Sequence, residues 1–309
     1  MELFRALGAL LDGPCGENRL IGHLLELGPV PDEPTHNDIF LFQLYPYASA
    51  FLGADGHMGG EARDRVAGFW RALGTTPPED PDHLRALLGG YAWLVDAQQR
   101  GNGKTTQACR DARHAFLWEH LLSWVLPFLT KLRQIAPPFY REWADTLEAL
   151  LFSESARLGP PTRRPLALRE AKPVPDPRET DGDSFFNALL SPVRSGLVLT
   201  RADLARAARD LGLGLRVGER AYILRSMMSQ GPRATLDWLG REARDWEHLH
   251  DRSGVTAPEV ADFWTQRATA TGRLLSDLSA DASDAVNHDS NHDTRADTRA
   301  DTRADTHNG

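Results

Sequence analysis

The chain has 309 residues, of which 41% are hydrophobic and 25% charged, a composition typical of a globular protein with a buried core. Its net charge of −8 argues against a nucleic-acid partner and against an anionic membrane surface. No apolar run approaches the roughly 20 residues that cross a bilayer, so membrane insertion is not expected.

Two further features concern the cell compartment. The chain has only two cysteines, Cys15 and Cys109, too few for a disulfide framework, and each is expected to be a small buried apolar residue. The stretch "MELFRALGALLDG" lacks the basic region and the small-residue cleavage site of a signal peptide. Together these features predict a cytoplasmic protein.

Helical spacing of apolar residues dominates the first half of the chain. The clearest stripe joins Val66, Phe69, Trp70 and Leu73 and ends at Gly74. Proline is expected to interrupt one helix near residue 46 and to kink or divide another at residue 127. The expected helical segments are 36–53, 59–74, 84–95, 109–134 and 137–154.

A proline-rich and charged stretch, residues 159–183, is predicted to be a partly extended linker. It contains "TRRPLAL", which resembles a twin-arginine export motif. That motif belongs at the start of a chain and before a long apolar run, and neither condition holds here. We therefore interpret the stretch as a linker.

The chain after the linker divides into two parts. Residues 184–279 are expected to be helical, with a capping box formed by Thr200 and Asp203 and exposed-looking Trp246 and Trp264. Residues 280–309 repeat the unit Asp-Thr-Arg-Ala with almost no apolar side chains, which predicts a disordered tail. Because no convincing strand pattern occurs, the predicted fold class is all-α.

Motifs that would indicate an enzyme or a metal site are weak. "RGNGKTTQ" would need glycine at position 98 to be a phosphate loop, and Gln98 stands there. No histidine pair has the spacing of metal ligands on one helix face. A metal site built from His83, Glu119 and His120 is conceivable but unsupported, so no cofactor is predicted.

The stretch "PEDPDHLRALL" contains an Asp-His pair at a predicted helix start. Asp80 is expected to cap this helix, with Pro81 at its first position and Asp82 favourably placed against the helix dipole. His83 has no role in such a helix start. Taken alone, the pair suggests acid-base chemistry in a helical enzyme or nucleotide-binding protein.

Several blocks between Leu41 and Glu154 resemble, in order, the TorD/DmsD/NarJ family of molybdenum redox-enzyme maturation chaperones. They are "LYPYASAFLGADGHMGGEARDRVAGFWRALG", "PEDPDHLRALL", "FLWEHLLSWVLPFLTKL" and "PPFYREWADTLEALLFSE". The chain departs from the family where Ala48 replaces a frequent glutamate, in the displaced proline before Asp82, and in the extra length beyond the linker. The departures affect the identity of the client more than the family.

The resemblance implies a compact helical bundle of the TorD-like type over residues 1–158 and a binding protein without catalytic turnover. Members of the family bind the twin-arginine signal peptide or the apo-form of a molybdopterin-containing oxidoreductase subunit, and assist cofactor insertion before export. Residues 1–155 carry 20 acidic and 13 basic side chains, so this part is net negative. An acidic rim beside an aromatic groove would complement two arginines followed by an apolar stretch.

The resemblance also implies roles for individual residues. The client-binding face is expected to include Asp82 as an acceptor for a client arginine and His83 as a donor to a peptide carbonyl. The other residues expected at that face are Phe69, Trp70, Leu84 and Tyr91. Tyr45, His120, Trp124, Pro127 and Phe128 are expected to form the packed spine of the fold or to line the groove.

Two alternatives to the chaperone stay open at this point. One is the helical enzyme or nucleotide-binding protein that uses Asp82 and His83. The other is a helical scaffold or regulator that acts through residues 184–279, with these residues capping the first domain, holding the client or forming a dimer. The sequence does not identify the client, the oligomeric state, or any bound guanine nucleotide or molybdopterin.

Overall fold

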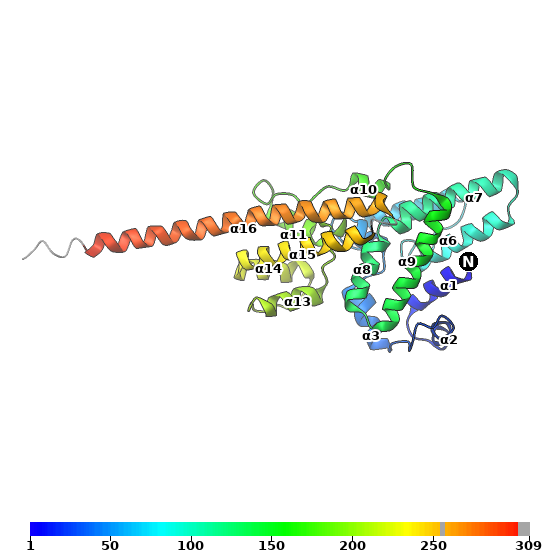
Figure 1. Ribbon diagram of the computed structural model, residues 1–309, viewed down its shortest axis with the longest axis horizontal. Coiled ribbons are helices and arrows are strands. Elements are labelled where there is room, and N and C mark those ends of the chain that lie inside the picture. Colours follow the sequence, from blue (N-terminus) through cyan, green and yellow to red (C-terminus); the bar gives the residue numbers. More distant parts are fainter. Residues whose placement is uncertain (254–256, 302–309) are drawn as a thin grey trace, which may run out of the picture.

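The computed structural model describes residues 1–253 and 257–301, with side chains described for residues 1–252 and 257–282. All regular elements in these ranges are helical, which confirms the predicted all-α class. Figure 1 shows a helical body from which the last helix projects.

The helices of the first half follow the predicted segments closely. They are α1 (Glu2–Ala9), α2 (Gly16–Leu24), α3 (Glu33–Asn37), α4 (Ala48–Leu52), α5 (Gly60–Ala72), α6 (Leu84–Arg100), α7 (Gly103–Phe116), α8 (Val125–Ile135) and α9 (Pro138–Leu158). A short 3₁₀ helix, η1 (Leu10–Asp12), and two π-helical turns, η2 (Asp38–Gln43) and η3 (Leu117–Leu122), complete this half.

The second half is helical as well, including part of the expected linker. Its helices are α10 (Leu166–Glu170), α11 (Gly182–Leu190), α12 (Pro192–Ser195), α13 (Arg201–Asp210), α14 (Arg220–Gln230), α15 (Pro232–Ser253) and α16 (Pro258–Asp301).

Helix α6 is the centre of the first half and packs against α1 and α7. Its apolar residues recur every three or four positions, so they form one stripe that turns inward. All of them are at most 3% exposed: Leu84, Leu87, Leu88, Tyr91, Leu94 and Val95. In the second half, α15 and α16 lie side by side, and α16 continues beyond the other helices (Figure 1).

Both predicted proline breaks occur, with small shifts in position. The chain leaves helical geometry at Leu44 and resumes at Ala48, so Pro46 lies in the gap. The second break falls at Trp124, whose backbone has φ −144° and ψ −22°. Pro127 then occupies the first turn of α8, where a missing N–H group leaves no helical hydrogen bond unmade.

Helix caps agree with the prediction in one case and differ in another. Thr200 and Asp203 form the expected capping box of α13. The prediction that Asp80 caps α6 is wrong, because this helix starts at Leu84 and its N-cap is His83. The segment before it is instead bonded to another part of the chain, which delays the helix by three residues.

A buried ion pair joins the second half of the chain to the first. Lys131 Nζ of α8 lies 2.5 Å from Asp203 Oδ2 of α13, and each residue is 1% exposed. Burial lowers the pKa of Lys131, while the lysine charge and the bonds from Thr200 hold the pKa of Asp203 low against the effect of burial. Residues 184–279 therefore pack on the first half through a contact that is costly to break.

Two expectations about exposure are wrong. Trp246 and Trp264 are each 1% exposed, and the His250 ring lies beside both of them, at 5.0 and 5.8 Å. The polar neighbours in the sequence lie on the outer face of the same helices. The cysteines are not buried either: Cys15 is exposed, and its sulfur accepts from a backbone N–H at the start of α2.

The boundaries of the expected segments remain predictions. Helix α16 extends to Asp301 and so overlaps the tail that we expected to be disordered from residue 280, while residues 302–309 of that tail lie outside the described residues. Among the described residues, none of the helices has the length and apolar content that a membrane crossing requires.

Candidate functional site

The segment with the Asp-His pair lies beside the start of α4. The Ala48 N–H donates to the Asp82 carbonyl oxygen at 3.0 Å, and the Asp82 carboxylate accepts from the Ser49 N–H at 3.0 Å. Asp82 is 1% exposed. A carboxylate is a favourable acceptor for N–H groups at a helix start, which have no partner within the helix. Asp82 thus joins two parts of the scaffold and has no surface for a partner in this conformation.

His83 acts as the N-cap of α6. Its Nδ1 accepts from the Arg85 N–H at 3.1 Å, and the Tyr47 ring packs edge-on against the imidazole at a centroid distance of 4.7 Å. Burial lowers the pKa of His83, which favours the neutral ring that can accept this bond. Asp82 and His83 therefore serve different backbone partners rather than one another.

Leu84 and Tyr91 are fully buried on the inner face of α6. The Tyr91 hydroxyl donates to Glu154 Oε2 at 2.7 Å, and Arg113 pairs with the same carboxylate. Burial and the neighbouring Glu154 raise the pKa of Tyr91. These two residues, expected at a client-binding face, belong to the core and cannot touch a client in this conformation.

Phe69 and Trp70 end the same helix but face different neighbours. Phe69 packs edge-on against His120 at 4.9 Å and against Phe116 at 5.3 Å. Trp70 lies over α6, where a Cβ built on Gly90 would come within 2.6 Å of its ring. The Trp70 Nε1 atom is buried and has no hydrogen-bond partner among the described residues. The structure brings Phe69 and His120 together, while Trp70 meets this group only through the Phe116 ring, at 6.3 Å.

The remaining expected residues divide between core and a separate hollow. Trp124 and Phe128 have no exposed surface, Pro127 is buried with them, and the Phe51 ring contacts both aromatic rings, at 5.2 and 5.9 Å. Tyr45 lines a small cavity of about 180 Å³ on another side, next to α14.

An apolar groove with a volume of about 510 Å³ lies between α4, α5, η3 and α10. Val66, Phe69 and Leu52 provide apolar walls, and Arg65 and Glu119 supply charge at its edges. A concave apolar surface with a few polar groups is the usual form of a site for a peptide or small molecule. We name this hollow the Phe69 groove.

His120 supplies the polar group on the inner wall of the Phe69 groove. Burial, and then the charge of Arg65, lower the pKa of His120 to about 4, so its ring is neutral at physiological pH. No hydrogen bond of its side chain occurs within the described residues. A neutral imidazole has one donor and one acceptor nitrogen, and both suit a peptide backbone. Among the described residues, no group of three or more His, Cys, Asp and Glu side chains is placed to hold a metal ion. The combination of His83, Glu119 and His120 considered from the sequence is therefore not such a group.

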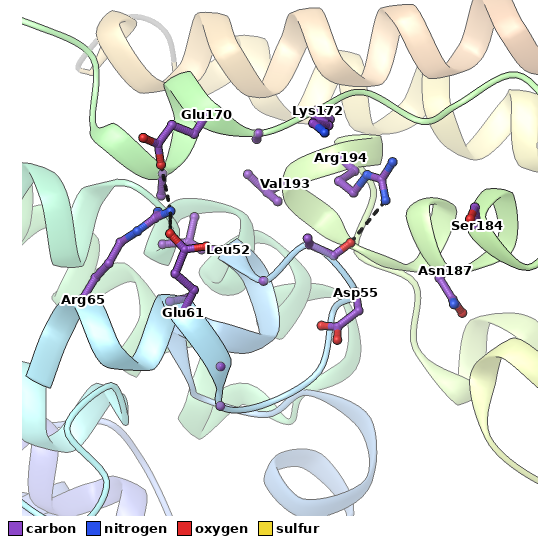
Figure 2. A pocket seen from close by; sticks show the side chains of 17 residues that line it. Leu52, Asp55, Glu61, Arg65, Glu170, Lys172, Ser184, Asn187, Val193 and Arg194 are labelled. Atoms are coloured by element: carbon purple, nitrogen blue, oxygen red, sulfur yellow. Dashed lines mark hydrogen bonds and ion pairs between the residues drawn. The ribbon is translucent and has the colours of Figure 1, made fainter. Parts of the chain in front are cut away.

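A second hollow of about 670 Å³ adjoins the Phe69 groove (Figure 2). In it Arg65 lies between two carboxylates, 2.7 Å from Glu61 and 2.8 Å from Glu170 of α10, as Figure 2 shows. The two hollows are bordered in common by Leu52, Ala62, Arg65 and Ala167. They form one trough across which α10 runs.

Sequence reasoning missed Arg65, Glu119 and Glu170 as parts of this site. Arg65 and Glu170 stand 105 positions apart, so no local spacing relates them. The available signal was the apolar pair Leu166 and Leu168 within a charged linker, which indicates a segment that packs on the body.

Comparison with protein families gives one match: residues 35–130 match the model described as "Nitrate reductase delta subunit". Searches of curated proteins and of solved structures gave no match. The matched residues run from α3 into α8 and include α4, α5 and η3, which form most of the Phe69 groove. The family is one of chaperones for molybdoenzyme maturation. Over residues 35–130 the predicted resemblance to the NarJ/TorD-like family is therefore confirmed.

Proposed function

We propose that this protein binds the twin-arginine signal peptide, or the apo-form, of a molybdopterin-containing oxidoreductase subunit and assists cofactor insertion before export. The observation that carries the proposal is the family match over residues 35–130, which contain α4, α5 and η3 of the Phe69 groove. Such work precedes export, so we also propose a cytoplasmic location. A homodimer stays a prediction.

The chemistry of the groove supports a signal peptide as its ligand. Such a peptide presents two arginines followed by apolar residues. Leu52, Val66 and Phe69 offer apolar surface, while Glu119 at the edge carries negative charge. The 20 acidic and 13 basic side chains of residues 1–155 make the surrounding field attractive to a cationic peptide.

The client contacts proposed from the sequence shift accordingly. Phe69 and His120 are the residues that we now propose to touch the client, because both line the groove. Asp82 and His83 are proposed to act indirectly, since they fix the start of α4 and of α6. The alternative of an enzyme that uses this pair as acid and base has less support, because each group is engaged with a separate backbone N–H.

The alternative role of residues 184–279 is harder to separate by deletion. Removing them would delete Asp203 and uncover the side of α8 on which they pack, and newly exposed apolar surface promotes aggregation. Loss of client binding after such a deletion would therefore not identify these residues as the binding surface. Point substitutions in the groove are the sharper test.

The test measures binding of a fluorescent peptide with two arginines and a following apolar stretch to the full-length protein. Phe69→Ala is expected to raise the Kd about tenfold, since truncating an interface aromatic commonly costs over 1 kcal/mol. His120→Gln is expected to weaken binding less. Phe42→Ala is the matched control, because Phe42 is 52% exposed and does not line the groove. Absence of saturable binding, or equal Kd values for all three, would contradict the proposal.

A further inference from the structure

Residues 159–173, which we name the strap, run across the trough and carry α10. The strap lines both hollows through Ala167, and Leu166 and Arg169 line the Phe69 groove. Leu168 is only 1% exposed and Ala167 8%, so this stretch is seated in the body rather than hanging free as a linker.

The two ends of the strap are held by side chains that bond to its backbone. At one end, Trp118 Nε1 donates to the Gly159 carbonyl oxygen at 3.1 Å. At the other, Arg267 donates to the Ala171 carbonyl oxygen, and Arg194 donates to that of Pro173 at 3.1 Å. These bonds do not depend on the side chains between them.

The middle of the strap is held by two carboxylates in the trough. Glu119 Oε2 accepts from the Leu166 N–H at 2.7 Å, and Glu170 pairs with Arg65 at 2.8 Å. The Arg65–Glu170 pair is partly open to solvent, with the carboxylate side chain 54% exposed, and pairs of this kind add little stability. What mainly opposes release of the middle is therefore the Leu166–Glu119 bond and the burial of Leu168, and a bound peptide with an N–H group and an apolar side chain can replace both while the two ends stay attached.

The strap presents the same order of chemical groups as the proposed client. Arg163 and Arg164 precede Leu166 and Leu168, so paired arginines are followed by apolar side chains. Arg163 is exposed, Leu166 lines the Phe69 groove and Leu168 is buried. Glu119, which holds the strap backbone, lies where a client arginine or backbone would also find an acceptor.

We propose that residues 162–168 occupy the client-binding site in the absence of a client, and that the client peptide binds by displacing them from the trough. The inference rests on the proposed function, because it assigns a regulator to the same groove. Displacement joins the two hollows and frees Glu119 and Arg65 from the strap. A client must then match the strap in chemistry to compete with it, so the strap contributes to client selectivity.

The experiment compares peptide binding by the full-length protein and by variants with a weakened strap. Glu170→Gln removes the Arg65 ion pair, and Leu168→Ser/Glu170→Gln also removes the buried anchor. The labelled peptide with two arginines and an apolar stretch is expected to bind Glu170→Gln about two- to fivefold more tightly than wild type, as loss of an exposed pair permits. The double variant should bind more tightly still. Glu148→Gln is the matched control, because it removes the Arg133–Glu148 pair outside the trough.

Two further readouts keep the outcomes distinct. Peptide binding should accelerate tryptic cleavage after Arg163, and an unlabelled peptide copying residues 159–171 should compete for the double variant. Equal Kd values for wild type and Glu170→Gln, together with unchanged cleavage, would overturn the strap proposal and leave the chaperone function intact. Absence of binding to wild type and to every variant would overturn the proposed function, and the strap proposal with it.

Discussion

Replacing Asp82 by alanine is expected to destabilise the protein rather than to remove a contact with the client. The Asp82 carboxylate is 1% exposed and accepts from the N–H of Ser49, which is itself fully buried. Alanine would leave that N–H group without a partner, at a cost of about 1–3 kcal/mol. Asp82→Asn keeps an oxygen acceptor and is expected to lose less, about 1 kcal/mol.

The assay is urea unfolding followed by far-ultraviolet circular dichroism. The midpoint should fall while the slope stays constant, because the surface exposed on unfolding is unchanged. In thermal unfolding the same loss corresponds to a decrease of about 2–10 °C in Tm, by the scaling for larger domains. Asp80→Ala is the control, since Asp80 is exposed and its carboxylate accepts only a long bond, 3.5 Å, from the Tyr47 hydroxyl.

Peptide binding measured well below the melting temperature completes this test. The Kd of Asp82→Ala should stay within about threefold of wild type, because the carboxylate does not face the Phe69 groove. An unchanged unfolding midpoint together with a Kd raised tenfold would refute the reasoning. That result would mean that Asp82 meets the client arginine directly, as the sequence alone suggested.

Three other predictions concern the scaffold. Gly196→Ala should lower the free energy of unfolding by at least about 3 kcal/mol, because φ is +77° and a Cβ would lie 2.4 Å from a backbone nitrogen of α16. Gly212→Ala is the control: φ is +67° but no atom lies near the added Cβ, so the loss in the same urea unfolding should be about 1 kcal/mol. Lys131→Met should lower the free energy of unfolding by about 3 kcal/mol, because the buried Asp203 would keep only the more exposed Arg206 as a cationic partner, and Lys131→Met/Asp203→Asn should recover much of the loss. His250 has its pKa lowered by burial to about 4, so the unfolded chain binds more protons between pH 4 and its ordinary value of 6.5. The contribution of His250 to stability should therefore be complete above pH 6.5 and be lost, by up to about 3 kcal/mol, on acidification to pH 4. His120 contributes in the same window, so unfolding midpoints of wild type and His250→Gln measured across it would check the share of His250.

The helices of this protein could be predicted because their apolar stripes are local and regular. In α6 the spacing alone indicated which residues turn inward, and Leu84 and Tyr91 do so. The same property bears on the site prediction, since a residue on the inner stripe of a central helix has no exposed surface for a partner in this conformation. The spacing of apolar residues predicts well which side chains are buried, but it does not indicate which of the buried side chains border a hollow.

The role of His83 could not be predicted, because it depends on a contact between distant segments. The Leu84 N–H donates to the Pro46 carbonyl oxygen at 2.8 Å, and Tyr47 forms an isolated antiparallel bridge with His83. Residues 80–83 form a turn, closed by a hydrogen bond from the His83 N–H to the Asp80 carbonyl oxygen at 3.2 Å, and α6 begins only at residue 84. Local capping rules therefore placed the helix start three residues too early.

The blocks that carry the family resemblance are explained by this same pairing. One block supplies the start of α4 and another supplies Asp82, whose carboxylate accepts the N–H of Ser49 from the first block. Such residues set the position of α4 and α5, and hence the shape of the Phe69 groove, without touching what enters it. Under the proposed function, client selectivity is then expected from groove residues outside the Asp-His pair, such as His120, and from the strap, which lies beyond the matched residues 35–130. On this reasoning, a related chaperone with the same Asp-His pair but a different strap should accept a different client.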